Sequence, residues 1–297
     1  MSYSAEAIQQ RAQRAVQKVK KIAINYGAES SSVLGWSQYL RLLGRTCKEA
    51  PALLRAGDLK PVDRSMGDRA IQIHYRGKRF RIDAETTDRV IDDGTYTFGG
   101  IREIYIRDCY FRGQDFSRLG PKPVVLDLGA NRGLFSTLMA AFGARVVCVE
   151  TRNDFVAAIQ ANMAINGFSN YEIASVFIGE GGRYAGHTSG MEYISPLSLL
   201  DRYQLNWIDM VKVDIEGSEF SLFEDPTWLK RVGMLSMEVH PEWGNPQMIL
   251  DVLRAQGFEV RISDPLFQPC SPDKAEFLYA WRSKGVVDGA SNPASRR

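Results

Sequence analysis

The chain has little cysteine and histidine, and it lacks any long hydrophobic run. Its 297 residues include 4 cysteines and 3 histidines, and no two cysteines have Cys-x-x-Cys spacing. This scarcity gives poor support to a disulfide framework or a cysteine-based zinc site. No apolar run approaches the roughly 20 residues of a membrane span, and residues 1–10 lack the apolar core of a signal peptide. We therefore expect a cytoplasmic protein without a membrane span.

The chain also lacks an excess of charge of either sign. Its 37 basic and 35 acidic residues give a net charge of +2, and 44% of its residues are hydrophobic. These values are typical of a globular protein, and we expect no nucleic-acid partner. Basic residues are nevertheless concentrated near the start, at Arg11, Arg14, Lys18, Lys20 and Lys21.

The first 57 residues have the pattern of a helical extension. Between Ala5 and Tyr26, apolar residues recur at helical spacing, at Ile8, Ala12, Ala15, Val16, Val19, Ile22 and Ala23. This predicts an amphipathic helix that packs on its own domain or joins two copies of the chain, with a membrane surface as the alternative. Residues 27–32 are expected to be a linker, and residues 33–54 a second helical stretch broken near Gly44.

Residues 58–120 are predicted to form a cap that contains a β-hairpin. The segments 71–75 and 78–82 alternate apolar and polar residues about Arg76-Gly77, which is the pattern of two antiparallel strands joined by a tight turn.

After Pro121 the pattern changes to strands that alternate with helices, which is typical of a parallel sheet. Strands are expected at 124–128, 144–150, 171–178, 210–215, 234–240, 258–262 and 277–281. Helices are expected at 134–142, 154–166, 197–203, 218–223 and 246–256. No helix precedes the last strand, so we expect it to be antiparallel. The main α/β domain is placed at 121–284, and a disordered tail at 285–297.

The first strand of this domain ends in a glycine-rich turn, Gly129-Ala130-Asn131-Arg132-Gly133, that opens a helix. Such turns hold nucleotide-like cofactors, either a dinucleotide such as NAD or S-adenosylmethionine. A pyrophosphate site needs glycine in the middle of the turn, where this chain has Asn131. The carboxylate of Asp127 would also repel a pyrophosphate and attract a sulfonium. The turn therefore favours S-adenosylmethionine.

Several motifs together resemble the FkbM family of S-adenosylmethionine-dependent methyltransferases. They are Asp127-Leu-Gly-Ala-Asn-Arg-Gly133, Glu150, the asparagines Asn162 and Asn166, and Lys212-Val-Asp-Ile-Glu-Gly-Ser-Glu219. The similarity runs from about Ile101 to about Trp281, although Thr151 stands where the family usually has proline. The resemblance implies a Rossmann-like, seven-stranded class I methyltransferase sheet with an antiparallel last strand. It also implies O-methylation of small molecules or sugars.

The resemblance assigns most of the cofactor contacts. It implies that Asp127 and the turn residues Gly129, Ala130, Asn131 and Gly133 hold the methionine portion, and that Glu150 holds the ribose. The alternative for Glu150 is a surface ion pair with Arg152. By position alone, Ala174, Ser175 and Val176 are expected near the adenine.

Polar residues at the ends of two later strands are the candidate catalytic groups. Lys212, Asp214 and Glu216 alternate, so they would share one face if the strand stays extended. We expect Asp214 nearest the transferred methyl group and count it with the cofactor contacts as well. Glu216 would orient the substrate or support Asp214. The alternative is an internal ion-pair network that only orders the strand end.

Glu238 and His240 repeat this arrangement one strand later. His240 is a candidate for the base that removes a hydroxyl proton, with a purely structural histidine as the alternative. Glu219 is expected to cap the next helix or to face solvent. No metal is predicted, although a divalent cation held by Asp214, Glu216 and Glu238 is an alternative. Residues 179–190, which include His187, are a candidate lid.

The sequence therefore predicts an S-adenosylmethionine-dependent methyltransferase that acts on a hydroxyl of a small molecule, with a sugar or glycan precursor favoured. A non-catalytic scaffold with the same fold and an NAD-dependent oxidoreductase are the alternatives. The methyl acceptor is not readable from the sequence.

Overall fold

The structure is a computed structural model, and it describes residues 27–179 and 192–282. These residues form two compact units. The first unit contains the residues up to 108 together with 132–141 and 157–169, and the second contains 109–131, 142–156 and the residues from 170 onward. The chain passes from one unit to the other several times, so neither unit is a continuous stretch of sequence.

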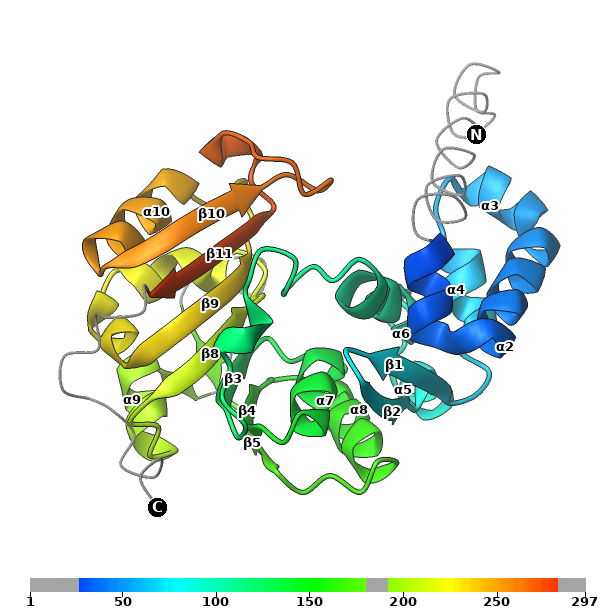
Figure 1. Cartoon of the computed structure of the whole chain (residues 1–297), viewed down its shortest axis with the longest axis horizontal. Coiled ribbons are helices and arrows are strands. Elements are labelled where there is room, and N and C mark those ends of the chain that lie inside the picture. Colours follow the sequence, from blue (N-terminus) through cyan, green and yellow to red (C-terminus); the bar gives the residue numbers. More distant parts are fainter. Residues whose placement is uncertain (1–26, 180–191, 283–297) are drawn as a thin grey trace. The chain divides into compact units, whose positions relative to one another are not determined.

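The second unit is built on a seven-stranded sheet in the order β10-β11-β9-β8-β3-β4-β5 (Figure 1). Its strands are β3 (Val124–Leu128), β4 (Arg145–Val149), β5 (Tyr171–Ala174), β8 (Ile208–Val213), β9 (Val232–Glu238), β10 (Phe258–Ser263) and β11 (Phe277–Arg282). Every pairing is parallel except the two that β11 makes. The predicted α/β sheet with an antiparallel last strand is confirmed. The expected strand at 171–178 divides, because β6 (Phe177–Ile178) leaves the sheet and pairs with β7 (Tyr193–Ile194).

One face of this sheet carries a continuous apolar core. The central strands are buried almost throughout, as their near-continuous apolar sequences require. Four helical segments contribute side chains to this core: α9 (Pro196–Arg202), the 3-10 helices η5 (Ser218–Phe223) and η6 (Pro226–Arg231), and α10 (Pro246–Ala255). The side chains of Ser195 and Asn245 cap α9 and α10, which explains where these helices begin.

The segment that begins at Cys109 is fastened to β9 and β11. The Tyr279 hydroxyl donates to the Cys109 carbonyl at 2.6 Å, and the Ser236 hydroxyl donates to the Tyr110 carbonyl at 2.7 Å. The Gln114 amide donates to the Leu235 carbonyl at 2.7 Å. These bonds fix the position of Tyr110. Its side chain contacts Lys212 on β8 and Asp214, which follows β8. The 3-10 helix η3 (Phe116–Arg118) then leads to β3.

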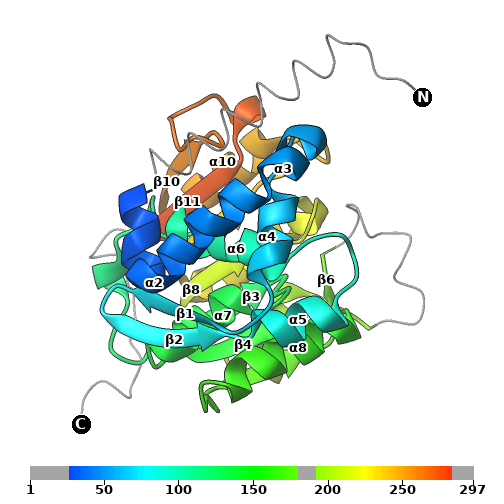
Figure 2. The same ribbon diagram turned by 90° about the vertical axis from the view of Figure 1, so that its right-hand side faces the viewer.

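The first unit contains helices and the predicted hairpin, which lies beside α2 (Figure 2). Its elements are α2 (Gly27–Lys48), α3 (Ala50–Ala56), α4 (Lys60–Met66), β1 (Ile71–Tyr75), β2 (Lys78–Ile82), α5 (Ala84–Val90), α6 (Thr97–Ile101), the π-helical turn η2 (Arg102–Ile106), α7 (Leu134–Ala141) and most of α8 (Asn153–Ala164). The hairpin is confirmed, with Tyr75 opposite Lys78 and positive φ at both Arg76 and Gly77.

Two expectations near the start are wrong. Residues 27–32 are the first turns of α2 instead of a linker, because Ser30, Val33 and Leu34 are buried and packing overrides their serine-rich composition. The helical path is interrupted at Gly35, where φ is 69°, and not at Gly44. The amphipathic helix expected at Ala5–Tyr26 and the tail expected at 285–297 lie outside the described residues.

Asn162 on α8 and Asn166 in the turn after it join this part of the chain to its neighbours in the first unit. Asn162 is fully buried; its amide donates to the Arg132 carbonyl at 2.8 Å and accepts from the Asp83 N–H at 2.8 Å. Asn166 pairs with both backbone groups of Arg81, accepting at 2.7 Å and donating at 2.7 Å. Asn162 and Asn166 thus form hydrogen bonds with backbone groups of Arg81 and Asp83 at the end of the hairpin. This is a structural role.

We expect Asn162→Ala to lower the free energy of unfolding by about 1–3 kcal/mol, because it leaves a buried N–H and a buried carbonyl without their partner. Urea unfolding measures this loss. The matched control is Gln160→Ala on the exposed side of the same helix, for which a change within about 0.5 kcal/mol is expected. Equal effects of the two substitutions would contradict the assigned role of Asn162.

Candidate active site

The glycine-rich turn after β3 has the backbone conformation that its sequence requires. Gly129, Asn131 and Gly133 have φ of 77°, 51° and 69°, in the left-handed region. A Cβ at Gly129 would lie 1.8 Å from the Asp214 carbonyl oxygen, so only glycine allows the turn to approach the end of β8 this closely. The ends of β3 and β8 are therefore held side by side.

Glu150, at the end of β4, is bound by three backbone N–H groups. Its Oε1 accepts from Thr151 at 2.8 Å and from Arg152 at 3.0 Å, and its Oε2 accepts from Asn131 at 2.8 Å. Burial raises the pKa of Glu150 above its ordinary value, although these hydrogen bonds oppose the rise. Because a carboxylate oxygen can accept two hydrogen bonds, Oε2 retains the capacity for another donor.

The surface ion pair considered for Glu150 is not formed. The Arg152 guanidinium pairs with Asp154 at 2.5 Å, and only the Arg152 backbone binds Glu150. The Glu150 carboxylate is thus directed to the turn and the cavity beside it.

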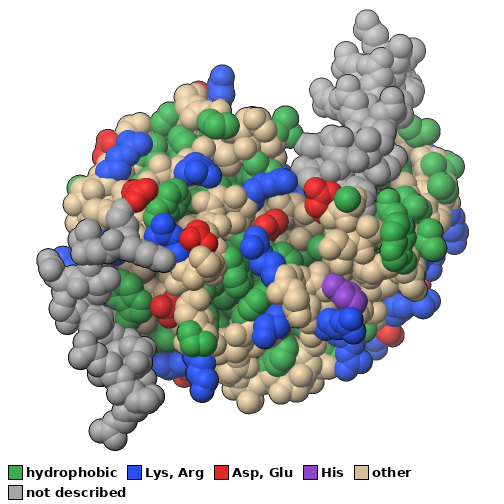
Figure 3. Space-filling model, in the orientation of Figure 1, with side chains coloured by type: hydrophobic (Ala, Val, Ile, Leu, Met, Phe, Trp, Pro, Cys, Tyr) green, Lys and Arg blue, Asp and Glu red, His purple; other side chains and the backbone are tan. Residues whose placement is uncertain are grey.

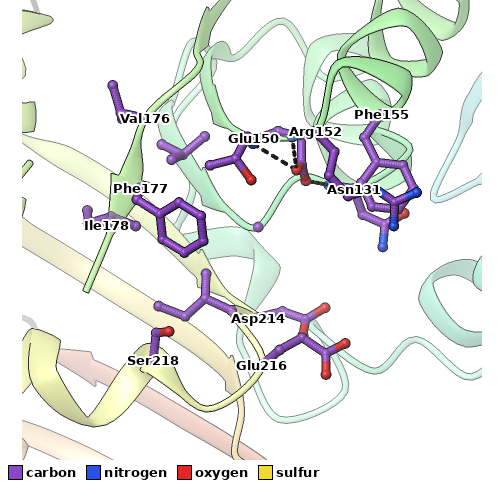
Figure 4. A pocket seen from close by; sticks show the side chains of 14 residues that line it. Asn131, Glu150, Arg152, Phe155, Val176, Phe177, Ile178, Asp214, Glu216 and Ser218 are labelled. Carbon is purple, nitrogen blue, oxygen red and sulfur yellow. Dashed lines mark hydrogen bonds between the residues drawn. The ribbon is translucent and has the colours of Figure 1, made fainter. Parts of the chain in front are cut away.

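A cavity of about 440 Å³ lies beside the turn, within the second unit (Figure 4). Apolar side chains line part of it, namely Val149, Phe155, Val176, Phe177, Ile178 and Ile215. Polar residues line the remainder, namely Gly129, Asn131, Glu150, Thr151, Arg152, Asp214, Glu216 and Ser218. A volume of this size with mainly apolar walls and a few polar groups is typical of a small-molecule site.

The predicted cofactor residues divide into those that line this cavity and those that do not. Gly129, Asn131, Glu150 and Asp214 line it. Asp127, Ala130, Gly133 and Ser175 are not among its lining residues, whereas Val176, next to Ser175, is. Sequence reasoning did not assign Phe155, Phe177, Ile178 or Ser218 to the site, because apolar residues of a helix or strand look like core residues and Ser218 was only one position of the Lys212-to-Glu219 motif.

Lys212 is the centre of a buried charged network. It faces Asp127 in the register of β8 and β3, and its Nζ lies 2.6 Å from the Gly129 carbonyl oxygen, 3.3 Å from Asp127 Oδ1 and 3.5 Å from Asp214 Oδ2. Burial alone would lower the pKa of Lys212, but the carboxylates of Asp127 and Asp214 outweigh it and raise the pKa. The lysine is therefore a fixed cation.

This network brings together two of the predicted site residues, Lys212 and Asp127. Lys212 is 3% exposed and Asp127 is fully buried, and their side chains contact each other. Neither lines the cavity, and their catalytic and cofactor roles stay predictions. Lys212 and Asp127 fit the alternative of an internal ion-pair network at the end of the strand. Asp214 and Glu216 line the cavity. Glu216 does not extend the face of β8, because the strand ends at Val213 and Glu216 has a left-handed φ of 54°.

Tyr110 is a member of this network that sequence reasoning missed. Its hydroxyl donates to Asp214 Oδ2 at 3.1 Å, and its ring centroid lies 5.4 Å from Lys212 Nζ. The ring contact favours the positive charge of Lys212, and the hydroxyl holds the Asp214 carboxylate in place. Nothing in the local sequence of Tyr110 signals this role, because the contact joins positions 104 residues apart.

His240 is held by Glu219. The Glu219 Oε1 accepts the His240 backbone N–H at 2.8 Å and lies 2.9 Å from Nδ1, while Oε2 accepts the Gly217 N–H at 2.8 Å. Burial alone would lower the pKa of His240, but Glu219, Asp214 and Glu216 outweigh it and raise the pKa. His240 itself is not among the residues that line the cavity, whereas Asp214 and Glu216 are.

The expectation that Glu219 faces solvent is wrong, because its side chain is fully buried. A sequence signal did exist. Glu219 lies among Phe220, Leu222 and Phe223 in η5, so a helix turn with this apolar content was bound to pack against the core. Glu238, also predicted, stands at the end of β9 and helps to raise the pKa of Lys212.

Trp243 lies against the loop that follows β8. A Cβ at Gly217 would lie 2.4 Å from the indole ring, so glycine is needed at this position, where φ is 97°. The indole remains 49% exposed. An aromatic face is therefore open to solvent next to Glu216.

The next features are a possible metal site and a possible membrane-spanning helix. In residues 27–179 and 192–282, no three His, Cys, Asp or Glu side chains are grouped so that they could hold a metal ion. No helix in these ranges is both long enough and apolar enough to cross a membrane. The candidate lid and His187 lie in residues 180–191, outside the described part of the chain.

Comparison with solved structures finds methyltransferases of low identity. A precorrin-6y C5,15-methyltransferase from Geobacter metallireducens is 15% identical, with 56% of this chain and 84% of that chain covered and a TM-score of 0.38. An rRNA methylase from Streptococcus thermophilus is 15% identical over 56% and 90% of the two chains, with a TM-score of 0.38. A Streptococcus mutans protein in complex with SAH is 12% identical over 56% and 91%, with a TM-score of 0.38.

Comparison of the sequence finds one family model. No curated protein matches the chain. Residues 191–260 match the family model described as the methyltransferase FkbM domain. This range includes the Lys212-to-Glu219 motif and His240. This part of the chain is therefore similar to the methyltransferase FkbM domain.

Proposed function

We propose that this chain transfers a methyl group from S-adenosylmethionine to a hydroxyl of a small molecule, and that a sugar or glycan precursor is the acceptor. The observation that carries the proposal is the buried Glu219 carboxylate bound to His240, whose pKa also responds to two carboxylates that line the cavity. In this proposal the acceptor alcohol binds beside His240 and loses its proton to the imidazole.

The residues around the cavity fit the cofactor. The apolar side chains of Val176, Phe177 and Ile178 suit an adenine ring, and Glu150 Oε2 can accept a ribose hydroxyl. The carboxylate of Asp214 attracts the ammonium and sulfonium groups of the cofactor. When bound, S-adenosylmethionine supplies an electrophilic methyl group on a sulfonium leaving group.

His240 acts as the general base in this proposal. With Glu219 ionised, the imidazole Nδ1–H donates to Oε1, so Nε2 of the neutral ring is left as the acceptor. The same Glu219 oxygen accepts the His240 backbone N–H, which fixes the direction of the ring. A general base in this position contributes about 10²–10⁴ to the rate.

Asp214 positions the reacting groups. Its carboxylate is held from behind by Tyr110 and Lys212, and its side chain is 25% exposed. A fixed carboxylate at the end of β8 can therefore orient an acceptor hydroxyl without moving itself, which lowers the entropic cost of alignment. Glu216, on the same loop, would bind another hydroxyl of the acceptor.

A sugar is favoured as the acceptor because of Trp243. Its exposed indole lies against Gly217, immediately after Glu216. An aromatic ring can pack against the C–H face of a sugar ring while neighbouring carboxylates accept the hydroxyl hydrogens. A flat apolar surface beside acidic groups is what such an amphipathic molecule needs.

The cofactor assignment predicts the effect of Glu150→Gln. A glutamine side chain offers one acceptor oxygen to three backbone N–H donors, so the turn would lose its fixed geometry together with a ribose contact. We expect the affinity for S-adenosylhomocysteine, measured by calorimetric titration, to fall about tenfold or more. Glu172→Gln, which alters an exposed ion pair with Arg145, serves as the control and should bind normally. Tight NADH binding by the native chain would contradict the assignment.

The base assignment predicts two linked results for methyl transfer to a panel of methyl glycosides. His240→Ala should lower kcat by about 10²–10⁴ while S-adenosylhomocysteine still binds. In Glu219→Gln, the loss of the carboxylate removes a group that raises the pKa of His240, so the acid limb of the kcat/KM profile should move to lower pH. Glu242→Gln, on the exposed residue two positions after His240, is the control and should leave the profile unchanged.

Two outcomes would contradict these roles. Undiminished transfer in His240→Ala would exclude His240 as the base. Cofactor binding without transfer to any glycoside would contradict the sugar assignment, and if simple alcohols and phenols also failed it would favour the scaffold alternative.

A further inference from the structure

Helix α2 exposes an apolar face that no described element covers. Trp36 is 71% exposed and Leu40 is 62% exposed, and both lie on α2 after the interruption at Gly35. Leu43 and Cys47 continue the same 4-3-4 spacing, which places the four side chains on one side of the helix. We call these four residues the α2 stripe. Figure 3 shows hydrophobic side chains gathered on the surface over α2.

The opposite side of α2 is the one that packs in the first unit. Leu34 and Leu42 are 1% and 2% exposed, and the helix contacts β1 and α4. The α2 stripe is therefore not required by the core. Leu54, on α3, adds another exposed apolar side chain at 44% exposure. A cluster of exposed large apolar side chains is typical of a surface that contacts another protein or a membrane.

Basic side chains run alongside the α2 stripe. Arg41 and Lys48 lie on α2, Arg55 lies on α3, and Lys48 and Arg55 are exposed. Arg41 pairs with Asp68, so its charge is partly balanced. An apolar face bordered by lysine and arginine is the pattern of a helix that lies at a membrane surface, where the apolar side chains enter the acyl region and the basic groups reach lipid phosphates.

Positive charge is also concentrated in the first 69 residues of the chain. Residues 1–69 contain 12 basic and 6 acidic residues, a net charge of +6, whereas the whole chain has a net charge of +2. The remaining 228 residues therefore have a net charge of −4. An anionic surface would attract residues 1–69 and repel the rest of the molecule.

The sequence before α2 has the same composition. Ile8, Ala12, Ala15, Val19 and Ile22 recur at alternating steps of four and three, and five basic residues stand among them. The composition of this segment, apolar residues with basic ones between them, is similar to that of α2.

We propose that the α2 stripe docks on an anionic lipid surface. Trp36 and Leu40 enter the interface, and Lys48 and Arg55 contact lipid phosphates. The proposal does not depend on the methyltransferase activity, since it concerns residues of the first unit alone.

The test is co-sedimentation of the full chain with vesicles of phosphatidylcholine alone or mixed with phosphatidylglycerol. The chain should sediment with the anionic vesicles, lose most of its binding at high salt and bind neutral vesicles weakly. A variant with both Trp36→Ser and Leu40→Ser should bind at least about tenfold more weakly. Lys48→Glu with Arg55→Glu should also weaken binding to the anionic vesicles. The control, Leu266→Ser, removes another side chain with 53% exposure and should bind as the native chain does.

Circular dichroism and thermal unfolding verify that each variant is folded, which is expected because the substituted side chains are exposed. Equal binding of the native chain and the Trp36/Leu40 variant would overturn the proposal, as would failure to bind either vesicle. Light scattering that finds a native dimer and a monomeric Trp36/Leu40 variant would also overturn it, because the stripe would then be the contact between two copies.

Discussion

The buried ammonium group of Lys212 is the interaction on which the candidate active site depends. It lies between the carboxylates of Asp127 and Asp214 and donates to the Gly129 carbonyl, so one cation connects β3, the glycine-rich turn and the end of β8. A buried charge is tolerated only when it is paired with good geometry. Without the ammonium, Asp127 and Asp214 would lose the buried cation that balances their charge, which would destabilise this end of the sheet.

This constraint explains why the polar groups of the site differ in role. Lys212 and Asp127 pair with each other and are buried. Asp214 is held by Lys212 and Tyr110, and it also lines the cavity. The turn then approaches the Asp214 backbone because Gly129 has no side chain, and its Asn131 N–H binds Glu150. The cavity is thus bordered by carboxylates whose positions follow from one cation and one glycine. A cationic cofactor suits such a border better than a pyrophosphate does.

A second constraint acts in the loop after β8, where Glu219 binds both His240 and Gly217. The loop after β8 and the end of β9 are joined by this single buried carboxylate. Gly217 has a further task, because the absence of its side chain makes room for the Trp243 indole. The proposed base and the proposed sugar platform therefore depend on neighbouring residues of one short loop.

The sequence predicted the elements of the sheet well, because buried parallel strands need apolar runs and the connecting helices need apolar residues at helical spacing. It predicted the hairpin at Arg76-Gly77 for the same local reason. It failed at residues 27–32, where a serine-rich stretch is helical because Ser30 and Val33 are buried. It also failed to separate Lys212 from Asp214, since alternation along a strand shows that two side chains share a face but not which of them is covered.

By itself, then, the sequence determined the α/β sheet, the antiparallel last strand, the glycine turn and the motif that marks the family, since all of these are recorded in residues close together in the chain. Only the tertiary structure decided that Tyr110 holds Asp214, that Glu219 is buried against His240, and that Trp36 and Leu40 face outward. Tyr110 and Asp214 are 104 positions apart, and Glu219 and His240 are 21 apart. Contacts of this kind, and the exposure of a helix face, depend on which elements pack together, which local patterns do not specify.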